Sequence, residues 1–172
     1  ELFTAIYTPK QRAEPYPILL YRTPYSIGDY GSDTYPTAKA MAPSAKMVED
    51  GYIFVYQDLR GTYKSEGNFE ITRVNLEPQD GPLATDESTD AYDTIDWLFN
   101  NVDGHNGRVG QWGISYSGWT TVQGMIDAHP ALKASSPQAS PSDMFIGDDW
   151  HHNGAFRLTY AFAWLNFAAQ DR

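Results

Sequence analysis

One serine, Ser115, lies in a run of small residues whose spacing indicates nucleophilic chemistry. Gly113 precedes it by two positions and Gly118 follows it by three, with a strand-like stretch before and a helix-compatible stretch from Trp119. This layout is typical of a nucleophile elbow, a sharp strand-to-helix turn that holds a serine hydroxyl above the end of a sheet. Small residues are needed there because the two backbones approach closely. We therefore expect Ser115 to be a nucleophile.

The elbow pattern departs from its usual form at one position. A second glycine would normally fall at position 117, where the sequence has Ser117, and Gly118 follows. Serine is small enough for the turn to form. In the alternative interpretation, Ser115 only caps a helix or forms a turn. The strand before it and the helix after it favour the catalytic role.

A nucleophilic serine needs a general base within hydrogen-bond reach and a group that orients this base. In α/β-hydrolases these partners follow the serine, the acid first and then the histidine. The histidines after the serine are His129, His151 and His152. His129 stands at the end of the predicted elbow helix, and the other two precede the further strands that a triad requires. We expect the chain to carry the nucleophile without its partners.

An oxyanion hole requires two donors that point at the charge developing on the carbonyl oxygen. The backbone N–H of Tyr116, the residue after the serine, is the expected first donor. The second should come from the loop after the second strand, where Tyr25 follows Pro24 and offers a phenolic hydroxyl. In the alternative interpretation, Tyr25 packs in this loop without a catalytic role.

The elements that must position these residues alternate between strands and helices, which predicts a mostly parallel sheet covered on both faces. Strands are expected over 2–8, 17–22, 51–58, 108–112 and 132–136. The first two are expected to form an antiparallel edge, and the third to be covered on both faces because it lacks alternation. Helices are expected over 38–48 (interrupted by Pro43), 89–100, 116–129 and 155–169.

Composition narrows the function classes. A chain of 172 residues can bury the core of one domain, and its net charge of −10 argues against nucleic acid and anionic membranes as partners. The absence of cysteine excludes disulfides, a thiol nucleophile and a thiolate metal site. No segment of the sequence is long and apolar enough to span a bilayer. A start at Glu1, without a methionine or leader, is typical of a fragment or a processed product.

Four ordered motifs cover nearly the whole chain: Thr23 to Tyr25, Gln57 to Phe69, Gly113 to Gly118 and Gly147 to Phe156. Together they resemble the α/β-hydrolase group that contains cocaine esterase and X-Pro dipeptidyl peptidases (CocE/NonD). The α-amino acid ester hydrolases, also named glutaryl-7-aminocephalosporanic acid acylases, are the most similar members. The resemblance implies an α/β-hydrolase fold and a serine hydrolase that cleaves acyl esters or amides through an acyl-enzyme.

In that group a complete enzyme has a helical cap and a C-terminal jelly-roll domain. The resemblance implies that residues 1–142 are the N-terminal part of the hydrolase domain and that residues 143–172 begin the cap. The triad acid and histidine would then lie beyond Arg172. The implied substrates are small esters or amides, such as α-amino acyl esters and β-lactam side chains. An exported, periplasmic location is favoured, and either a homo-oligomer or a complementary chain that completes the site is compatible with it.

The resemblance also implies roles for single residues. It places the nucleophile at Ser115 and the oxyanion tyrosine at Tyr25. α-Amino acid ester hydrolases hold the substrate ammonium group with a cluster of carboxylates, and one member matches Asp149, with Asp148 as the adjacent alternative. Carboxylates around one site bind a cation strongly and select against neutral substrates. Without the resemblance, both aspartates would be interpreted as solvated loop charges or helix caps.

The remaining polar motifs predict supporting roles. His151 and His152 have no third ligand nearby in the sequence, so we expect hydrogen bonds around the carboxylates rather than a metal site, and no cofactor. Arg60 and Glu66 are expected to form an internal ion pair in a loop near the site. Rival functions are a cocaine-esterase-like carboxylesterase, an X-Pro dipeptidyl peptidase, or an inactive fragment that needs the rest of the enzyme.

Overall fold

The computed structural model describes residues 1–10, 14–28, 30–31, 34–36, 42–73, 75–76 and 84–168. Its main sheet has the strand order β1-β3-β2-β4-β5, in which β2, β3, β4 and β5 are parallel and β1 is antiparallel to β3. The strands are β1 (Thr4–Tyr7), β2 (Tyr16–Thr23), β3 (Ile53–Asp58), β4 (His105–Ile114) and β5 (Leu132–Gln138). The helices beside them are α2 (Ala45–Asp50), α3 (Glu87–Asn101) and α4 (Tyr116–Gln123).

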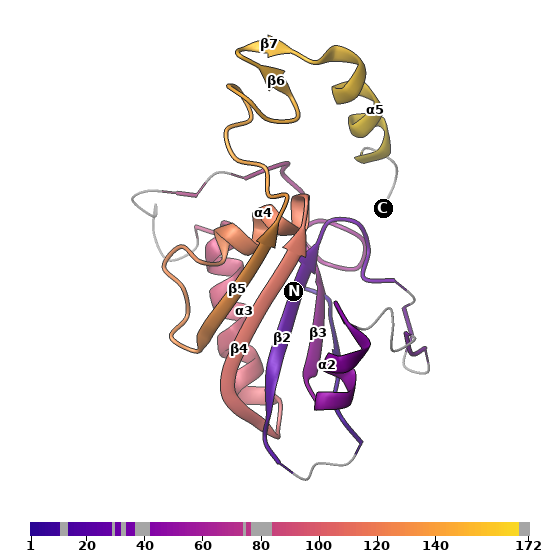
Figure 1. Cartoon of the computed structure of the whole chain (residues 1–172), viewed down its shortest axis with the longest axis vertical. Coiled ribbons are helices and arrows are strands. Elements are labelled where there is room, and N and C mark those ends of the chain that lie inside the picture. The colour runs from indigo at the N-terminus through magenta and orange to yellow at the C-terminus, as the bar shows by residue number, and fades with distance from the viewer. Residues whose placement is uncertain are drawn as a thin grey trace.

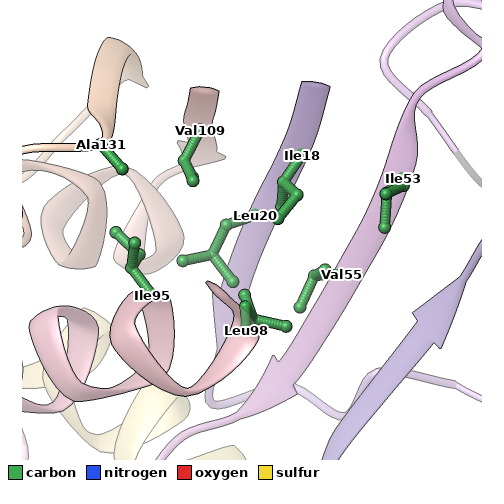
Figure 2. Packing of buried hydrophobic residues seen from close by; sticks show 8 residues of the cluster. All are labelled: Ile18, Leu20, Ile53, Val55, Ile95, Leu98, Val109 and Ala131. Atoms are coloured by element: carbon green, nitrogen blue, oxygen red, sulfur yellow. The ribbon is translucent and has the colours of Figure 1, made fainter. Parts of the chain in front are cut away.

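Helices cover both faces of this sheet, which confirms the predicted layering. In Figure 1, α2 lies in front of the sheet, and α3 and α4 lie behind it. The main core lies between the sheet and α3 (Figure 2). Its buried members, all labelled in the figure, are Ile18, Leu20, Ile53, Val55, Ile95, Leu98, Val109 and Ala131. The intervening strand residues Leu19 and Phe54 instead pack towards Met47 and Val48 of α2. Successive side chains alternate between faces, so β3 is covered on both, as predicted.

The start of α3 is defined by a capping box. The Asp86 carboxylate accepts hydrogen bonds from the N–H groups of Ser88 and Thr89, and the Thr89 hydroxyl accepts one from the Asp86 N–H. These bonds satisfy donors that the first helical turn leaves unused. The helix, which the sequence predicts from residue 89, therefore begins two residues earlier, at Glu87.

The predicted antiparallel edge is wrong for the second strand. β1 is an antiparallel edge strand, but it pairs with β3 and not with β2. β2 lies in the middle of the sheet between β3 and β4. The reason is that Ile18, Leu19 and Leu20 are all buried, so both faces of β2 require cover, and an edge position would leave them exposed.

Three other sequence predictions are corrected. The elbow helix ends at Gln123, where Gly124 caps it, instead of reaching His129. The predicted ion pair between Arg60 and Glu66 does not form, because Arg60 pairs with Asp90 of α3, and Glu66 binds the N-terminal amino group. The helix predicted over 38–48 is seen only as α2, after Pro43, and residues 38–41 lie outside the described residues.

Beyond β5 the chain leaves the main sheet. Two short strands, β6 (His151–His152) and β7 (Ala155–Phe156), pair with each other and are followed by α5 (Leu158–Ala168). In Figure 1 this segment lies above the end of the sheet where α4 begins. The helix starts later than the predicted residue 155 because residues 155–156 belong to β7. No helix in the described ranges is long and apolar enough to cross a membrane.

Candidate active site

Ser115 lies at the turn between β4 and α4, in the backbone conformation expected of an elbow. Its φ of 60° and ψ of −123° place a non-glycine residue in a strained region. The Ser115 N–H donates to the Gln138 carbonyl oxygen at 2.9 Å, and the Ser115 carbonyl oxygen accepts from the Trp119 N–H at 2.9 Å. The serine itself is exposed. The turn is therefore held from β5 and α4 while the hydroxyl remains accessible to a substrate.

The two glycines of the motif allow this turn to close. A Cβ atom on Gly113 would lie 2.0 Å from the Ser117 carbonyl oxygen, and one on Gly118 would lie 2.5 Å from the Gln138 carbonyl oxygen. Neither distance can be accommodated, since both neighbours are backbone atoms. Ser117, which replaces the expected second glycine, is fully buried and hydrogen-bonds through Oγ to the Tyr21 hydroxyl at 3.2 Å. The turn thus accepts serine at position 117.

Tyr25 and Tyr116, the two predicted sources of oxyanion donors, lie against each other. Their ring centroids are 6.2 Å apart in an edge-to-face arrangement, although the residues are far apart in the sequence. The Tyr25 N–H donates to the Thr23 hydroxyl at 3.1 Å, which anchors the start of its loop to the end of β2. As the first residue of α4, Tyr116 has a backbone N–H that the helix does not use internally. The fold brings both residues to the elbow.

The Tyr116 side chain is locked in place by its surroundings. Its hydroxyl accepts a hydrogen bond from the Thr72 N–H at 2.7 Å, and burial raises the pKa of this phenol above its ordinary value. The indole of Trp164, on α5, stacks on the Tyr116 ring with an interplanar angle of 2°, and Trp150 contacts Trp164 edge-to-face at 5.1 Å. The segment after β5 therefore reaches the elbow through aromatic contacts.

Asp148 and Asp149 differ in their surroundings. The Asp148 carboxylate accepts hydrogen bonds from the N–H groups of Ser142 and Asp149, so it stabilises its own loop. The Asp149 carboxylate has no hydrogen bond or ion pair with any residue that the structure describes. Asp149 is next to Trp150, whose ring leads through Trp164 to the elbow. Of the two aspartates, Asp149 is the one with its carboxylate available to a ligand.

Two histidines lie at the far end of the sheet from the elbow serine, and His151 is held within the segment after β5. His105 begins β4 and His129 precedes β5, so both lie at the end of the parallel sheet opposite Ser115. The His129 Nδ1 accepts from the Ala131 N–H at 3.1 Å, in keeping with a structural role. The His151 Nδ1 lies 2.7 Å from the Met144 carbonyl oxygen, between the rings of two phenylalanines. No group of metal-binding side chains is found among the described residues.

Sequence reasoning missed a buried acid beside the Tyr25 loop. Asp58 is the last residue of β3, is fully buried, and accepts hydrogen bonds from the Ile27 N–H and the Tyr30 hydroxyl. Burial raises the pKa of this carboxyl, and the hydrogen bond from Tyr30 opposes that rise. A charged residue at the end of an apolar strand was the available signal, whereas its partners could be found only from the fold.

Comparison with known proteins agrees with this geometry. The whole chain, residues 1–172, matches the family of the X-Pro dipeptidyl-peptidase (S15 family). Cocaine esterase from Rhodococcus sp. (strain MB1 Bresler) is 30% identical over 150 residues, which are 87% of this chain and 23% of that protein.

Two solved structures are similar over most of the chain. An aminopeptidase from the marine sediment archaeon Thaumarchaeota archaeon has a TM-score of 0.84 and 41% identity, over 99% of this chain and 28% of that one. An α-amino acid ester hydrolase has a TM-score of 0.79 and 45% identity, over 91% of this chain and 26% of that one. These similarities confirm the α/β-hydrolase fold, and the chain spans about a quarter of the length of each relative.

Proposed function

Because this chain belongs to the X-Pro dipeptidyl-peptidase (S15) family of hydrolases, we propose that it carries the nucleophile of a serine hydrolase that cleaves acyl esters or amides. The observation that carries the proposal is the exposed Ser115 in its strained turn, with Tyr25 and Tyr116 packed together beside it. In this proposal residues 1–142 are the first part of the hydrolase domain, and residues 143–172 begin a cap over the site.

The reaction follows from the positions of these groups. The Ser115 Oγ attacks the substrate carbonyl carbon, and a histidine base takes the hydroxyl proton. The oxyanion that forms accepts hydrogen bonds from the Tyr25 hydroxyl and the Tyr116 N–H, in place of the water that would solvate it. The alcohol or amine leaves with the proton from the base, and water then releases the acyl group from the serine. The base and its acid are supplied from beyond residue 172.

The proposed substrates carry a free α-ammonium group. The available carboxylate of Asp149 lies in the segment that reaches the elbow through Trp150 and Trp164, and it would attract such a cation. The 45% identity to an α-amino acid ester hydrolase supports α-amino acyl esters as substrates. β-Lactam side chains are included in the proposal because they can carry the same α-ammonium group. A carboxylesterase like the cocaine esterase relative, or an X-Pro dipeptidyl peptidase, is the competing activity in the family.

Labelling with a fluorophosphonate probe tests the nucleophile in the whole gene product that contains this sequence. The probe should modify Ser115, and the variant Ser115→Ala should lose both labelling and ester hydrolysis. Ser44 is a matched control because it is exposed and its side chain makes no cap hydrogen bond, so Ser44→Ala should behave as the unsubstituted protein. Undiminished hydrolysis by Ser115→Ala would refute the proposal.

A different class of function competes with catalysis by this chain. The chain spans about a quarter of its relatives, and none of the contacts described for His129 and His151 involves the elbow serine, which favours an inactive piece that acts only with the remainder of the enzyme. The isolated 172-residue chain should then fail to react with the probe, whereas the whole gene product should react. Turnover by the isolated chain would rule this alternative out.

A further inference from the structure

Asp58 lies where the loop that carries Tyr25 passes over the end of the sheet. It ends β3 beside Thr23, its parallel partner at the end of β2, and its side chain has 0% exposure. Its backbone is also fixed, because the Asp58 carbonyl oxygen accepts a hydrogen bond from the Ser65 hydroxyl at 2.6 Å. A carboxylate buried this completely requires hydrogen-bond donors. Two of them come from the segment that follows Tyr25.

The carboxylate holds this segment at two points. Its Oδ1 accepts from the Ile27 N–H at 3.1 Å, and its Oδ2 accepts from the Tyr30 hydroxyl at 2.8 Å. The Tyr30 oxygen is in turn 3.0 Å from the Ser26 Oγ, which also accepts from the Gly28 N–H at 3.1 Å. A chain of hydrogen bonds thus runs from Gly28 through Ser26 and Tyr30 to the buried acid. Linked hydrogen bonds that end on a charge polarise and strengthen one another.

The backbone of Ser26 needs this support. Its φ of 76° is in the left-handed region, which a non-glycine residue enters at a cost. Because Ser26 directly follows Tyr25, its conformation sets the direction in which the chain leaves that residue. The Thr23 hydroxyl holds the other side through the Tyr25 N–H. The chain is therefore held on both sides of Tyr25, by Thr23 at the end of β2 and by Asp58 at the end of β3.

Other groups around the acid contact the ring of Tyr30 and leave its hydroxyl bonded to Asp58. The Lys64 Nζ lies 4.6 Å from the centre of the Tyr30 ring, and the rings of Phe3 and Tyr63 pack against it. The Lys64 N–H lies 3.4 Å from Oδ2 of Asp58, a longer contact than the one from Tyr30. Burial and the adjacent carboxylate raise the pKa of Tyr30 to about 12, which keeps its hydroxyl protonated and able to donate.

We propose that Asp58, through Ile27 and Tyr30, is a positioning residue that holds the Tyr25 hydroxyl towards the oxyanion. The inference rests on the proposed function, in which Tyr25 is the side-chain donor. It adds to that function the reason why the Tyr25 hydroxyl points at the oxyanion. The orientation is important because an oxyanion donor is effective only when it is directed at the developing charge before the reaction begins. The competing explanation is that Asp58 stabilises the fold and has no bearing on the orientation of Tyr25.

A double-mutant cycle between Tyr30 and Tyr25 in the whole gene product separates the two explanations. Tyr25→Phe should lower kcat for a p-nitrophenyl ester by roughly 100-fold or more, as loss of an oxyanion donor does. Tyr30→Phe keeps the packed ring and removes only the hydroxyl, so it should lower kcat by roughly tenfold with KM unchanged. In the Tyr25→Phe background it should have no further effect. Tyr35, which is 72% exposed, gives the matched control Tyr35→Phe, with unchanged kcat.

The outcomes distinguish failure of the inference from failure of the function. If Tyr30→Phe leaves kcat unchanged, or if its effect multiplies with that of Tyr25→Phe, Asp58 and Tyr30 do not act through Tyr25. If Tyr25→Phe is fully active while Ser115→Ala is inactive, the oxyanion role of Tyr25 and this inference both fail, but the serine mechanism stands. Asp58→Asn should also lower kcat. If Asp58→Asn does not fold, the result for Tyr30→Phe alone tests the inference.

Discussion

The Gly113 Cα and the Ser117 carbonyl oxygen are so close that a Cβ atom on Gly113 would lie 2.0 Å from that oxygen. The end of strand β4 and the first turn of helix α4 therefore pack with their backbones in direct contact. The absence of a side chain at Gly113 allows this approach, and the chain passes from strand to helix at Ser115, which has a φ of 60°. The glycine two residues before the serine is thus a steric requirement of the site.

Gly113→Ala should destabilise the protein by about 1–3 kcal/mol, because backbone atoms must shift to admit the methyl group. Thermal unfolding of the whole gene product measures the change, and esterase activity should fall as the turn is displaced. Gly147→Ala is the control, since nothing lies within 4 Å of a Cβ atom at Gly147. Equal melting temperatures for the two variants would show that the turn has more room than the structure indicates.

Asp86→Ala should remove the capping box of α3 and lower the free energy of unfolding by about 1 kcal/mol. Burial opposes ionisation of Asp86, but hydrogen bonds from the N–H groups of Thr89 and Leu76 outweigh it and lower the pKa of this carboxyl below 3.8. Asp86 therefore binds a proton more readily in the unfolded chain than in the folded protein. The charged cap stabilises the fold above pH 3.8, and this stabilisation is lost as the pH falls through the folded-state pKa of Asp86.

The pH dependence can be isolated with Asp86→Asn, since asparagine keeps a capping oxygen without the charge. The difference in unfolding free energy between the unsubstituted protein and this variant should be constant near neutral pH and shrink below pH 3.8. Urea titrations at several pH values measure it, with the exposed Asp103→Asn as the control. A difference that grows in acid would contradict the assigned direction of the shift.

Arg22→Met should destabilise the protein by about 3–5 kcal/mol, because it leaves Glu87 buried without its partner. The Arg22 Nη2 lies 3.1 Å from the Glu87 Oε2, and both side chains are almost completely buried. The matched surface substitution is Lys46→Met, which breaks the exposed pair with Asp50 and should cost less than about 1 kcal/mol. If urea unfolding shows similar losses of unfolding free energy for the two variants, the buried pair is no more important to stability than the exposed one, and the prediction is wrong.

The cost of Arg22→Met should also depend on pH. Burial already raises the pKa of Glu87, and removing the opposing attraction of Arg22 raises it further. With a folded-state pKa above the unfolded value, the variant gains relative stability in acid and loses it as the pH rises. The destabilisation should therefore be larger at pH 7 than at pH 4, where a protonated Glu87 is easier to bury.

Asp149→Asn should lower kcat/KM for an α-amino acid ester by roughly tenfold or more and leave a neutral ester of the same alcohol unaffected, since only the cation loses its countercharge. Paired kinetics on the two substrates in the whole gene product give the ratio directly. Asp148→Asn is the comparison, because Asp148 is engaged within its own loop. Equal losses on both esters would point to a structural effect and would favour the carboxylesterase alternative.

Much of the fold could be predicted because its signals are local. The apolar run of β3, the elbow glycines and the acidic start of α3 each depend on residues within a few positions of one another. The side-chain and backbone requirements of such turns and caps are decided over one or two turns of chain. The sequence by itself therefore determined the layered α/β character and the location of Ser115.

Only the tertiary structure decided which distant segments meet. It placed β2 in the middle of the sheet, paired Arg60 with Asp90 instead of Glu66, and brought the Tyr25 loop against both Tyr116 and Asp58. These contacts join residues that are tens of positions apart, and their partners depend on strand order, which pattern and spacing leave open. Burial of apolar faces selects that order, and it acts on the whole chain at once.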